Sequence, residues 1–380
     1  MIRFEAVSKS YDGGTLAVNN LTLEAPTGQI TVLVGPSGCG KTTSLRMVNR
    51  MIEPTSGRIT IDGRDTATMD AAALRRGIGY VIQHGGLFPH QSIERNIATV
   101  PLLLGQDKKA AYARAHELLE RVGLPVSLAR RYPAQLSGGQ QQRVGVARAL
   151  AADPPVMLMD EPFSAVDPVV REQLQQEFMH LQRDLGKTII FVTHDIDEAI
   201  TLGDQVAVLR VGGRLAQIAP PRDLLTQPAD DFVADFVGRD RGYRALSFID
   251  GSLPVRHEAT IAPGESITRA RALARDAWVL VAQDGRPLGW LDLDRVPTGP
   301  DTAADTVTTQ SLALGGTLAR QGGSLRAALD AALSAPSGRG VIVDGDGRLL
   351  GTVAARDVID VIEERRAGPL HTSSDQADVR

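Results

Sequence analysis

A glycine-rich stretch near the start of the chain, GPSGCGKTT at residues 35–43, carries residue types suited to holding phosphate groups. It matches G-x-x-x-x-G-K-[ST], a pattern in which backbone N–H groups curl around phosphates because glycine has no Cβ to clash. Lys41 is spaced to reach the β- and γ-phosphates, and the Thr42 hydroxyl is a ligand type for Mg²⁺. The spacing therefore predicts a nucleoside triphosphate site formed by Gly35, Pro36, Ser37, Gly38, Cys39, Gly40, Lys41, Thr42 and Thr43.

Two adjacent carboxylates follow an apolar run in VMLMDE, residues 156–161. Asp160, at the end of a predicted strand, is placed to hold Mg²⁺ directly or through water. Glu161 could polarise an attacking water as a general base. Alone, the pair would equally fit two solvated acids leading into a loop. Together with the phosphate loop, it favours phosphate hydrolysis.

Two further polar side chains come directly after predicted strands. His194, in IIFVTHDIDEA, could contact the γ-phosphate or orient the catalytic water. Gln83, in GYVIQHGGLFPH, could hold water or metal. Taken alone, each residue more often has a local structural role. Cys39, inside the phosphate loop, is predicted to be a small filler, because phosphate chemistry needs no thiol.

A second glycine pair occurs in LSGGQ, residues 136–140. Ser137 and Gln140 fit a capping box at the start of a helix. That box does not explain Gly138 and Gly139, which each cost about 1 kcal/mol in a helix relative to Ala. Bare backbone at a helix N-terminus is a second anion-binding surface. The sequence leaves open whether the two phosphate-facing surfaces meet within one chain.

The elements that must position these residues alternate between apolar strands and helices. Strands are predicted at 30–34, 156–159 and 188–192, and a helix from Lys41 onward, which indicates a parallel sheet covered on both faces. The 380 residues suit two or three domains. A net charge of −4 gives no support to nucleic-acid binding, and one cysteine excludes a disulfide framework. No run approaches the roughly 18 apolar residues of a membrane span, and no targeting segment is expected.

The C-terminal third contains an internal repeat. WVLVAQDGRPLGWLDLDRV at 278–296 aligns without gaps on GVIVDGDGRLLGTVAARDV at 340–358. Each copy is predicted to form a strand, an Asp-Gly turn, a strand and the start of a helix. We expect an N-terminal domain at 1–236, a linker at 237–245, repeats at 246–307 and 308–368, and a disordered tail at 369–380.

Over residues 1–234 the ordered motifs resemble the nucleotide-binding subunit of ABC transporters. Residues 35–43 resemble the Walker A loop, Gln83 the Q-loop, 136–140 the LSGGQ signature, 156–161 Walker B, 164–167 the D-loop and His194 the switch histidine; Tyr11 occupies the place of an adenine-stacking aromatic. The resemblance implies an α/β P-loop NTPase fold with a parallel sheet core, an antiparallel β subdomain and a helical subdomain. It also implies ATP and Mg²⁺ as cofactors, Glu161, His194, Gln83 and Lys41 in catalysis, and Thr42, Gln83 and Asp160 at the metal.

The family's working unit is a head-to-tail homodimer attached to permease subunits. By that resemblance Ser137, Gly139 and Gln140 act in trans on ATP held by the partner, and the protein lies peripherally on the cytoplasmic face of the membrane. Phe88, Pro89 and His90 would touch the permease, although local packing explains them equally well.

Closer similarity is to ATP-binding subunits of importers for glycine betaine, carnitine, choline or proline betaine, which work with a solute-binding protein. The repeat resembles the paired CBS domains (α+β) on those subunits, which regulate transport by sensing ionic strength or binding a nucleotide. Asp357, a possible ribose contact, aligns with Arg295 in the degenerate first copy, so a purely structural module stays open. Further alternatives are an importer of ergothioneine or another amine or amino acid, a soluble ABC ATPase acting on DNA or ribosomes, and a nucleotide sensor with vestigial ATPase.

Overall fold

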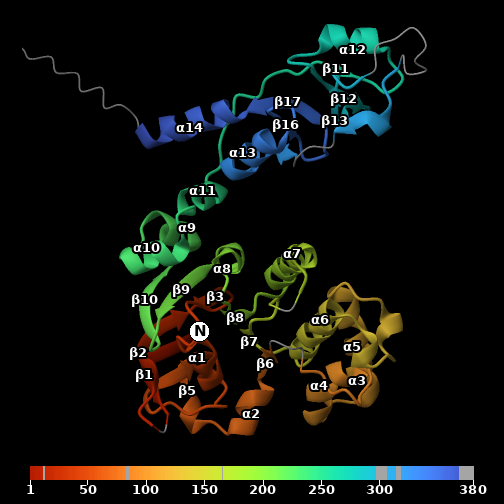
Figure 1. The fold of residues 1–380 in the computed structure, drawn as a ribbon. Coiled ribbons are helices and arrows are strands. Elements are labelled where there is room, and N and C mark those ends of the chain that lie inside the picture. The colour runs from red at the N-terminus through yellow and green to blue at the C-terminus, as the bar shows by residue number, and fades with distance from the viewer. Residues whose placement is uncertain (12, 83–85, 165, 297–305, 314–317, 368–380) are drawn as a thin grey trace, which may run out of the picture. The chain divides into compact units, whose positions relative to one another are not determined.

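A six-stranded sheet in the order β10-β9-β3-β8-β7-β6 organises Met1–Arg239, the first of two units into which the computed structural model divides the chain (Figure 1). The structure describes residues 1–11, 13–82, 86–164, 166–296, 306–313 and 318–367. In this sheet β10 runs antiparallel to β9, and the other neighbouring strands are parallel. The strands are β3 (Ile30–Val34), β6 (Ile78–Val81), β7 (Val156–Asp160), β8 (Thr188–Val192), β9 (Gln205–Arg210) and β10 (Arg214–Ala219).

Three of these strands are the ones predicted from apolar runs. Every residue of β3, β7 and β8 is buried, as expected for strands covered on both faces. The helix predicted from Lys41 is α1 (Lys41–Val48). The predicted parallel α/β core is therefore confirmed.

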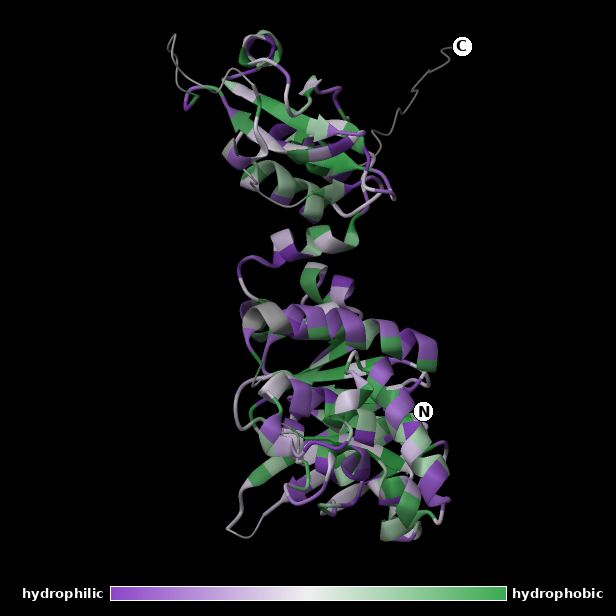
Figure 2. Ribbon diagram, turned by 90° about the vertical axis from the view of Figure 1, so that its right-hand side faces the viewer, coloured by the Kyte–Doolittle hydropathy of each residue, from purple (hydrophilic) through white to green (hydrophobic). Residues whose placement is uncertain are grey.

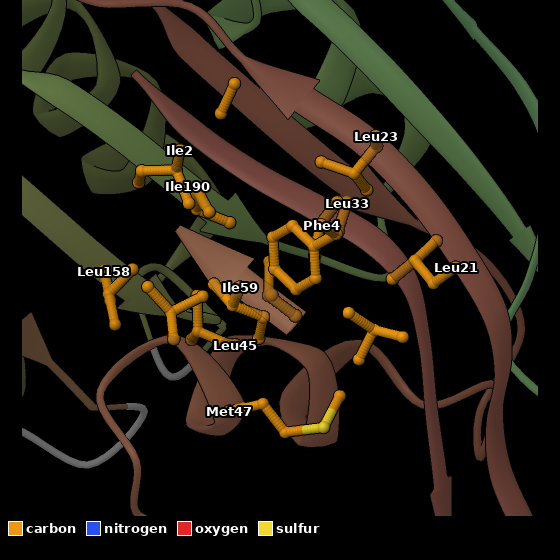
Figure 3. Packing of buried hydrophobic residues seen from close by; sticks show 14 of the residues in the cluster. Ile2, Phe4, Leu21, Leu23, Leu33, Leu45, Met47, Ile59, Leu158 and Ile190 are labelled. Atoms are coloured by element: carbon orange, nitrogen blue, oxygen red, sulfur yellow. The ribbon is translucent and has the colours of Figure 1, made fainter. Parts of the chain in front are cut away.

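A second, antiparallel sheet in the order β2-β1-β4-β5 packs against this core. Its strands are β1 (Ile2–Ser10), β2 (Leu16–Ala25), β4 (Ser56–Ile61) and β5 (Arg64–Asp65). Phe4 of β1, Leu45 of α1 and Leu158 of β7 share one buried cluster (Figure 3), so helix α1 is held between the two sheets. Each such side chain contributes about 1.5–3 kcal/mol on burial. This cluster fixes the position of the loop that precedes α1.

The chain between β6 and β7 forms a helical subdomain. Its helices are α3 (Ile93–Ile97), α4 (Thr99–Leu103), α5 (Lys108–Arg121) and α6 (Gly138–Leu150), and α6 packs on α3, α5 and strand β6. The remaining helices of the unit are α2 (Ala71–Arg76), α7 (Pro168–Leu185), α8 (Ile196–Leu202), α9 (Pro221–Thr226) and α10 (Asp231–Val237). Within the described residues, no helix has the length and apolarity needed to span a membrane.

The second unit, Asp240–Arg380, contains two small sheets in the orders β11-β12-β13-β14 and β15-β16-β17. Figure 2 shows strands of both units largely in green, the hydrophobic colour, while many helical residues around them are purple. The strands are β11 (Thr260–Ile261), β12 (Trp278–Gln283), β13 (Arg286–Asp292), β14 (Leu312–Ala313), β15 (Ala319–Arg320), β16 (Arg339–Val343) and β17 (Leu349–Ala354). The helices are α11 (Arg241–Ala245), α12 (Ile267–Leu273), α13 (Leu325–Ser334) and α14 (Ala355–Ala367).

The internal repeat forms equivalent hairpins that differ in detail. Strands β12 and β13 are joined by Asp284 and Gly285, both with positive φ, as a two-residue hairpin loop requires. The second hairpin has a longer turn, in which Asp344 Oδ1 accepts from the Asp346 and Arg348 amides at 2.9 and 2.8 Å. Helix α14 begins at Ala355, inside the second copy, as predicted. In the first copy, described residues 293–296 form turns and bends, not the predicted helix.

The segments that precede the two aligned stretches pack on the other stretch. Leu246, Ile249 and Val255, which precede 278–296, join the core around 340–358, whereas Val307 and Leu312, which precede 340–358, join the core around 278–296. Each hydrophobic core therefore contains a segment from the chain region of the other copy, and these exchanged segments hold the two copies together. Within the stretch expected to be a linker, 237–245, the chain forms α11, and the expected tail at 369–380 lies outside the described residues.

Candidate nucleotide site

The glycine loop between β3 and α1 requires glycine at two positions. A Cβ built on Gly35 would lie 2.3 Å from the Leu209 carbonyl oxygen, and one on Gly40 would lie 2.3 Å from that of Ala17. Gly40 also adopts φ +89° as the N-terminal cap of α1. The absence of a Cβ at these two glycines therefore lets the loop curl tightly into the N-terminus of α1, the arrangement that binds phosphate.

Lys41 lies buried beneath this loop. Its Nζ donates to the carbonyl oxygens of Gly35 at 2.8 Å and Pro36 at 3.1 Å, so the ammonium group braces the loop from inside. Cys39 is fully buried in the hydrophobic core, and burial raises the pKa of its thiol. A thiol in this setting is a small packing group, consistent with the predicted filler role.

Thr42 and Asp160 place two oxygen ligands side by side. The Thr42 hydroxyl donates to Asp160 Oδ1 at 2.9 Å, and Asp160 is buried at the end of β7. Burial raises the pKa of the Asp160 carboxyl, while the Thr42 hydrogen bond and the nearby Arg46 guanidinium oppose that shift. Mg²⁺ in nucleotide sites takes one or two protein oxygens and completes its shell with phosphates and water. This donor pair fits that requirement.

Glu161 and His194 meet at the same edge of the sheet. Because β7 pairs with β8 in the register Asp160↔Val192, the residues that follow both strands are neighbours. His194 Nδ1 lies 3.0 Å from Glu161 Oε2, so Nδ1 carries the proton when the carboxylate accepts. Glu161 has φ +46°, and its carbonyl accepts from Ser164 Oγ at 2.9 Å. This hydrogen bond from Ser164 therefore stabilises the left-handed backbone of Glu161.

A cavity of about 720 Å³ joins these groups. Its described lining consists of Ala17, the loop residues 35–43, Glu161, His194 and Phe236. The volume lies within the range of small-molecule sites. Tyr11, predicted to stack on adenine, is not among these residues; its ring is exposed, with Lys9 Nζ 5.3 Å from the ring centroid. Gln83 lies outside the described residues.

The signature residues lie elsewhere, in the helical subdomain. Ser137 caps α6 through the predicted box: its Oγ accepts from the Gln140 amide at 3.3 Å, and Gln140 Oε1 accepts from the Ser137 amide at 3.0 Å. Gly138 is exposed, with open space where a Cβ would be. None of Ser137, Gly139 and Gln140 is among the described residues lining the cavity, so the structure does not bring the two glycine motifs together there.

Three residues of the first unit have no predicted role from the sequence, and two of them, Arg46 and Phe236, lie at the site. Arg46 Nη2 lies 3.9 Å from Asp160 Oδ2, Phe236 lines the cavity, and Arg148 Nη1 donates to the Gly86 carbonyl at 2.7 Å. Arg148 is an arginine among apolar neighbours in RVGVARAL, which is a usable signal. Arg46 and Phe236 meet the site through tertiary packing, for which the sequence offers no signal.

The fold and this site define a P-loop ATPase. The ABC transporter family matches residues 18–164. The osmoprotectant import ATP-binding protein OsmV of Salmonella typhimurium is 43% identical over 388 residues, covering 98% of this chain and 100% of the relative. The choline transport ATP-binding protein OpuBA of Bacillus subtilis is 43% identical, covering 95% of this chain and 96% of the relative. The chain therefore belongs to the ATP-binding proteins of ABC transporters.

A solved structure agrees with this assignment. A dimeric ATP-binding cassette in a post-hydrolysis state bound to ADP and Pi is 34% identical and covers 58% of this chain and 99% of its own, with a TM-score of 0.54. The predicted family, the α/β P-loop ATPase fold of the first unit and the ATPase activity are confirmed. The individual roles predicted for site residues stay predictions.

Proposed function

We propose that this ATPase energises an importer of quaternary ammonium osmoprotectants such as glycine betaine, carnitine, choline or proline betaine. The observation that carries the proposal is similarity along nearly the whole chain, C-terminal unit included, to the osmoprotectant and choline transport proteins named above. A match confined to the ATPase domain would support only the general family. Importers of other amines, such as ergothioneine, are the second candidate.

The site geometry supports hydrolytic roles for five of the predicted residues: Lys41, Thr42, Asp160, Glu161 and His194. Bound Mg²⁺ would neutralise phosphate charge, with Thr42 and Asp160 as its protein ligands. Lys41 and the loop amides would hold the phosphates. Glu161 would accept the proton of the attacking water at its carboxylate, and His194, hydrogen-bonded to that carboxylate, would hold it in orientation.

A homodimer with signature residues acting in trans accounts for the separation of the two glycine motifs. The exposed N-terminus of α6 presents Ser137, Gly139 and backbone amides. None of these residues is among the described residues that line the phosphate cavity of the same chain. A second copy, placed head to tail, would bring a triphosphate to that helix end.

A groove of about 460 Å³ between the helical subdomain and the sheet suits the permease. Its lining includes Met51, Tyr80, Phe88, Val100 and Arg148, with Met51 and Phe88 exposed. The buried Asn96 amide fixes the Phe88 loop, since Asn96 Oδ1 accepts from the Phe88 amide at 2.7 Å. We place this face of the protein against the cytoplasmic side of the membrane-embedded subunits.

We assign the C-terminal unit a regulatory role without a nucleotide at Asp357. The Asp357 carboxylate pairs with Arg256 and accepts from the Ala354 amide at 3.0 Å. A ribose hydroxyl would have to displace an arginine from a buried acid. Of the two modes of regulation, we therefore propose that the C-terminal unit regulates transport by sensing ionic strength.

Transport by the reconstituted complex tests the proposed function. The chain would be assembled in proteoliposomes with the permease and solute-binding protein of its transporter, and ATP-dependent uptake of labelled glycine betaine, choline, carnitine and ergothioneine would be compared. We expect the quaternary ammonium osmoprotectants to be transported and to compete with one another. Uptake of ergothioneine alone would replace the proposed substrate class, and uptake without ATP would contradict the role of this subunit.

A further inference from the structure

Phe236 carries the one phenyl ring among the described residues that line the phosphate-loop cavity. Phosphate binding uses amides, hydroxyls and cations, so the chemistry of hydrolysis does not call for a half-buried aromatic ring. The ring lies in the same cavity as the glycine loop, Glu161 and His194. Its position therefore points to a contact with bound nucleotide or to closure of the cavity.

Helix α10, which carries Phe236, is firmly anchored. The rings of Phe232 and Phe236, one turn apart, stack with centroids 6.2 Å apart and an interplanar angle of 18°. The Arg210 guanidinium lies 4.4 Å from the Phe232 ring centroid and also pairs with Asp230. Asp230 in turn caps α10, because its carboxylate accepts from the Val233 amide at 3.1 Å. The Phe236 ring is thus held in place by contacts that do not involve the nucleotide.

The same strand that anchors α10 also touches the phosphate loop. Arg210 is the last residue of β9, and the carbonyl of the preceding Leu209 occupies the space where a Cβ of Gly35 would be. The phosphate loop and helix α10 therefore both contact strand β9 of the central sheet. A shift of α10 relative to β9 would move Phe236 relative to the loop.

Helix α10 is also the last helix of the first unit. It ends at Val237 and is followed by Gly238, whose φ of +90° and ψ of 164° are accessible almost only to glycine. The second unit begins two residues later, at Asp240. Any displacement of α10 thus acts on the point where the chain enters the C-terminal unit.

We propose that Phe236 contacts bound nucleotide and that α10 thereby couples occupancy of the phosphate-loop cavity to the C-terminal unit. The coupling rests on ATP binding by the first unit and is independent of which solute is transported. Coupling free energy is reciprocal, so a constraint on the segment after Gly238 would change ATP affinity by the same factor.

The contact is tested by equilibrium ATP binding to the full chain in a Glu161→Gln background, which keeps the nucleotide intact. Phe236→Ala should weaken ATP binding by about two- to tenfold, and Phe236→Leu, which keeps apolar bulk, should weaken it less. The comparison variant is Phe232→Leu, which removes the ring stacked on Phe236 but no residue of the cavity lining, and it should weaken ATP binding less than Phe236→Ala does. Unchanged affinity in both Phe236 variants, or equal weakening in the Phe232 variant, would overturn the contact. No ATP binding by the parent would instead contradict the ATPase assignment.

The coupling is tested by amide hydrogen exchange on the same full-length proteins. Added ATP should slow exchange in α10 and in residues 238–248 of the parent, and this protection should be lost in Phe236→Ala. Circular dichroism of each variant verifies its fold. Absence of ATP-dependent protection at α10 in a parent that binds ATP would overturn the coupling while leaving the ATPase assignment intact.

Discussion

At the residue scale, the position of the predicted general base depends on a strained backbone at Glu161 itself. Glu161 has φ +46°, a conformation that costs a non-glycine residue about 1–2 kcal/mol. The strain is offset by the hydrogen bonds that its backbone makes, N–H to the Val192 carbonyl at 2.9 Å and carbonyl from Ser164 Oγ at 2.9 Å. Such strain concentrates at functional sites, where geometry rather than stability is decisive.

Glu161→Gln should therefore separate binding from hydrolysis. The amide keeps the size of the side chain but cannot accept a proton from water, so steady-state ATP turnover should fall by about 10²- to 10⁴-fold. ATP affinity, which depends on the loop and Lys41, should stay close to that of the parent. Turnover by phosphate release and affinity by equilibrium binding would be measured side by side. Retained turnover would assign the proton transfer to another group.

Glu198 gives a pH-dependent prediction at the same scale. It is buried on α8, its Oε1 accepts from Gln175 Nε2 at 3.0 Å, and burial raises its pKa above the ordinary value of 4.5. Above that value the unfolded chain releases a proton that the folded protein keeps. The contribution of Glu198 to the free energy of unfolding therefore falls as pH rises through the window between the unfolded and folded pKa.

Glu198→Gln should gain stability relative to the parent as pH rises above about 4.5. Chemical unfolding would be followed at several pH values by circular dichroism, which reports both units. The two tryptophans, Trp278 and Trp290, both lie in the second unit, so their fluorescence serves as an internal control that should not change. A stability difference independent of pH would show that Glu198 keeps an ordinary pKa.

At the element scale, the capping box of α6 combines structure with function. Ser137 satisfies the Gln140 amide of its own helix and, in the proposed dimer, also faces phosphate held by the partner. Ser137→Ala should cost about 1 kcal/mol of local stability and lower ATP turnover by about tenfold or more. The matched control is Ser266→Ala, since Ser266 caps α12 in the second unit by the same kind of bond to the Arg269 amide.

The two variants distinguish capping from phosphate contact. Ser266→Ala should lose a similar stability and keep full turnover, as measured by thermal unfolding and phosphate release. If Ser137→Ala and Ser266→Ala hydrolysed ATP at the same rate, Ser137 would have only the structural role of capping α6. A Ser137 variant that is inactive by itself but active when mixed with Glu161→Gln protomers would support action in trans, because a mixed dimer retains one complete site.

Elements built from local patterns were predictable, and their tertiary contacts were not. The continuous apolar runs at β3, β7 and β8, the glycine loop and the α6 capping box all follow from short sequence windows. The 3.9 Å approach of Arg46 to Asp160 and the position of Phe236 depend on how distant segments pack. Asp357 illustrates the difference: its alignment suggested a ribose contact, whereas the fold pairs it with Arg256, 101 residues earlier in the chain.

At the scale of the whole molecule, the C-terminal unit is held together by exchanged segments. The stretch before the first repeat pairs with the second one, Arg256 and Thr352 exchanging two backbone hydrogen bonds of 2.9 Å each. The Arg256 side chain then pairs with Asp357 of α14, and it is 58% exposed while Asp357 is 6% exposed. Solvent reaches one side of this ion pair, so dissolved salt can weaken it.

Arg256→Gln should therefore blunt the response of the assembled transporter to ionic strength. We expect ATP turnover of the reconstituted parent complex to change between about 0.1 M and 1 M salt, over which the Debye length falls from about 10 Å to about 3 Å. Without the Arg256 charge, turnover should be the same at both ends of that range, whereas Arg256→Lys should keep most of the response because it keeps the charge. If Arg256→Gln responded to salt like the parent, the ion pair would be a purely structural tie between the two repeats, and the sensor would have to be sought in the exposed charges elsewhere in Asp240–Arg380.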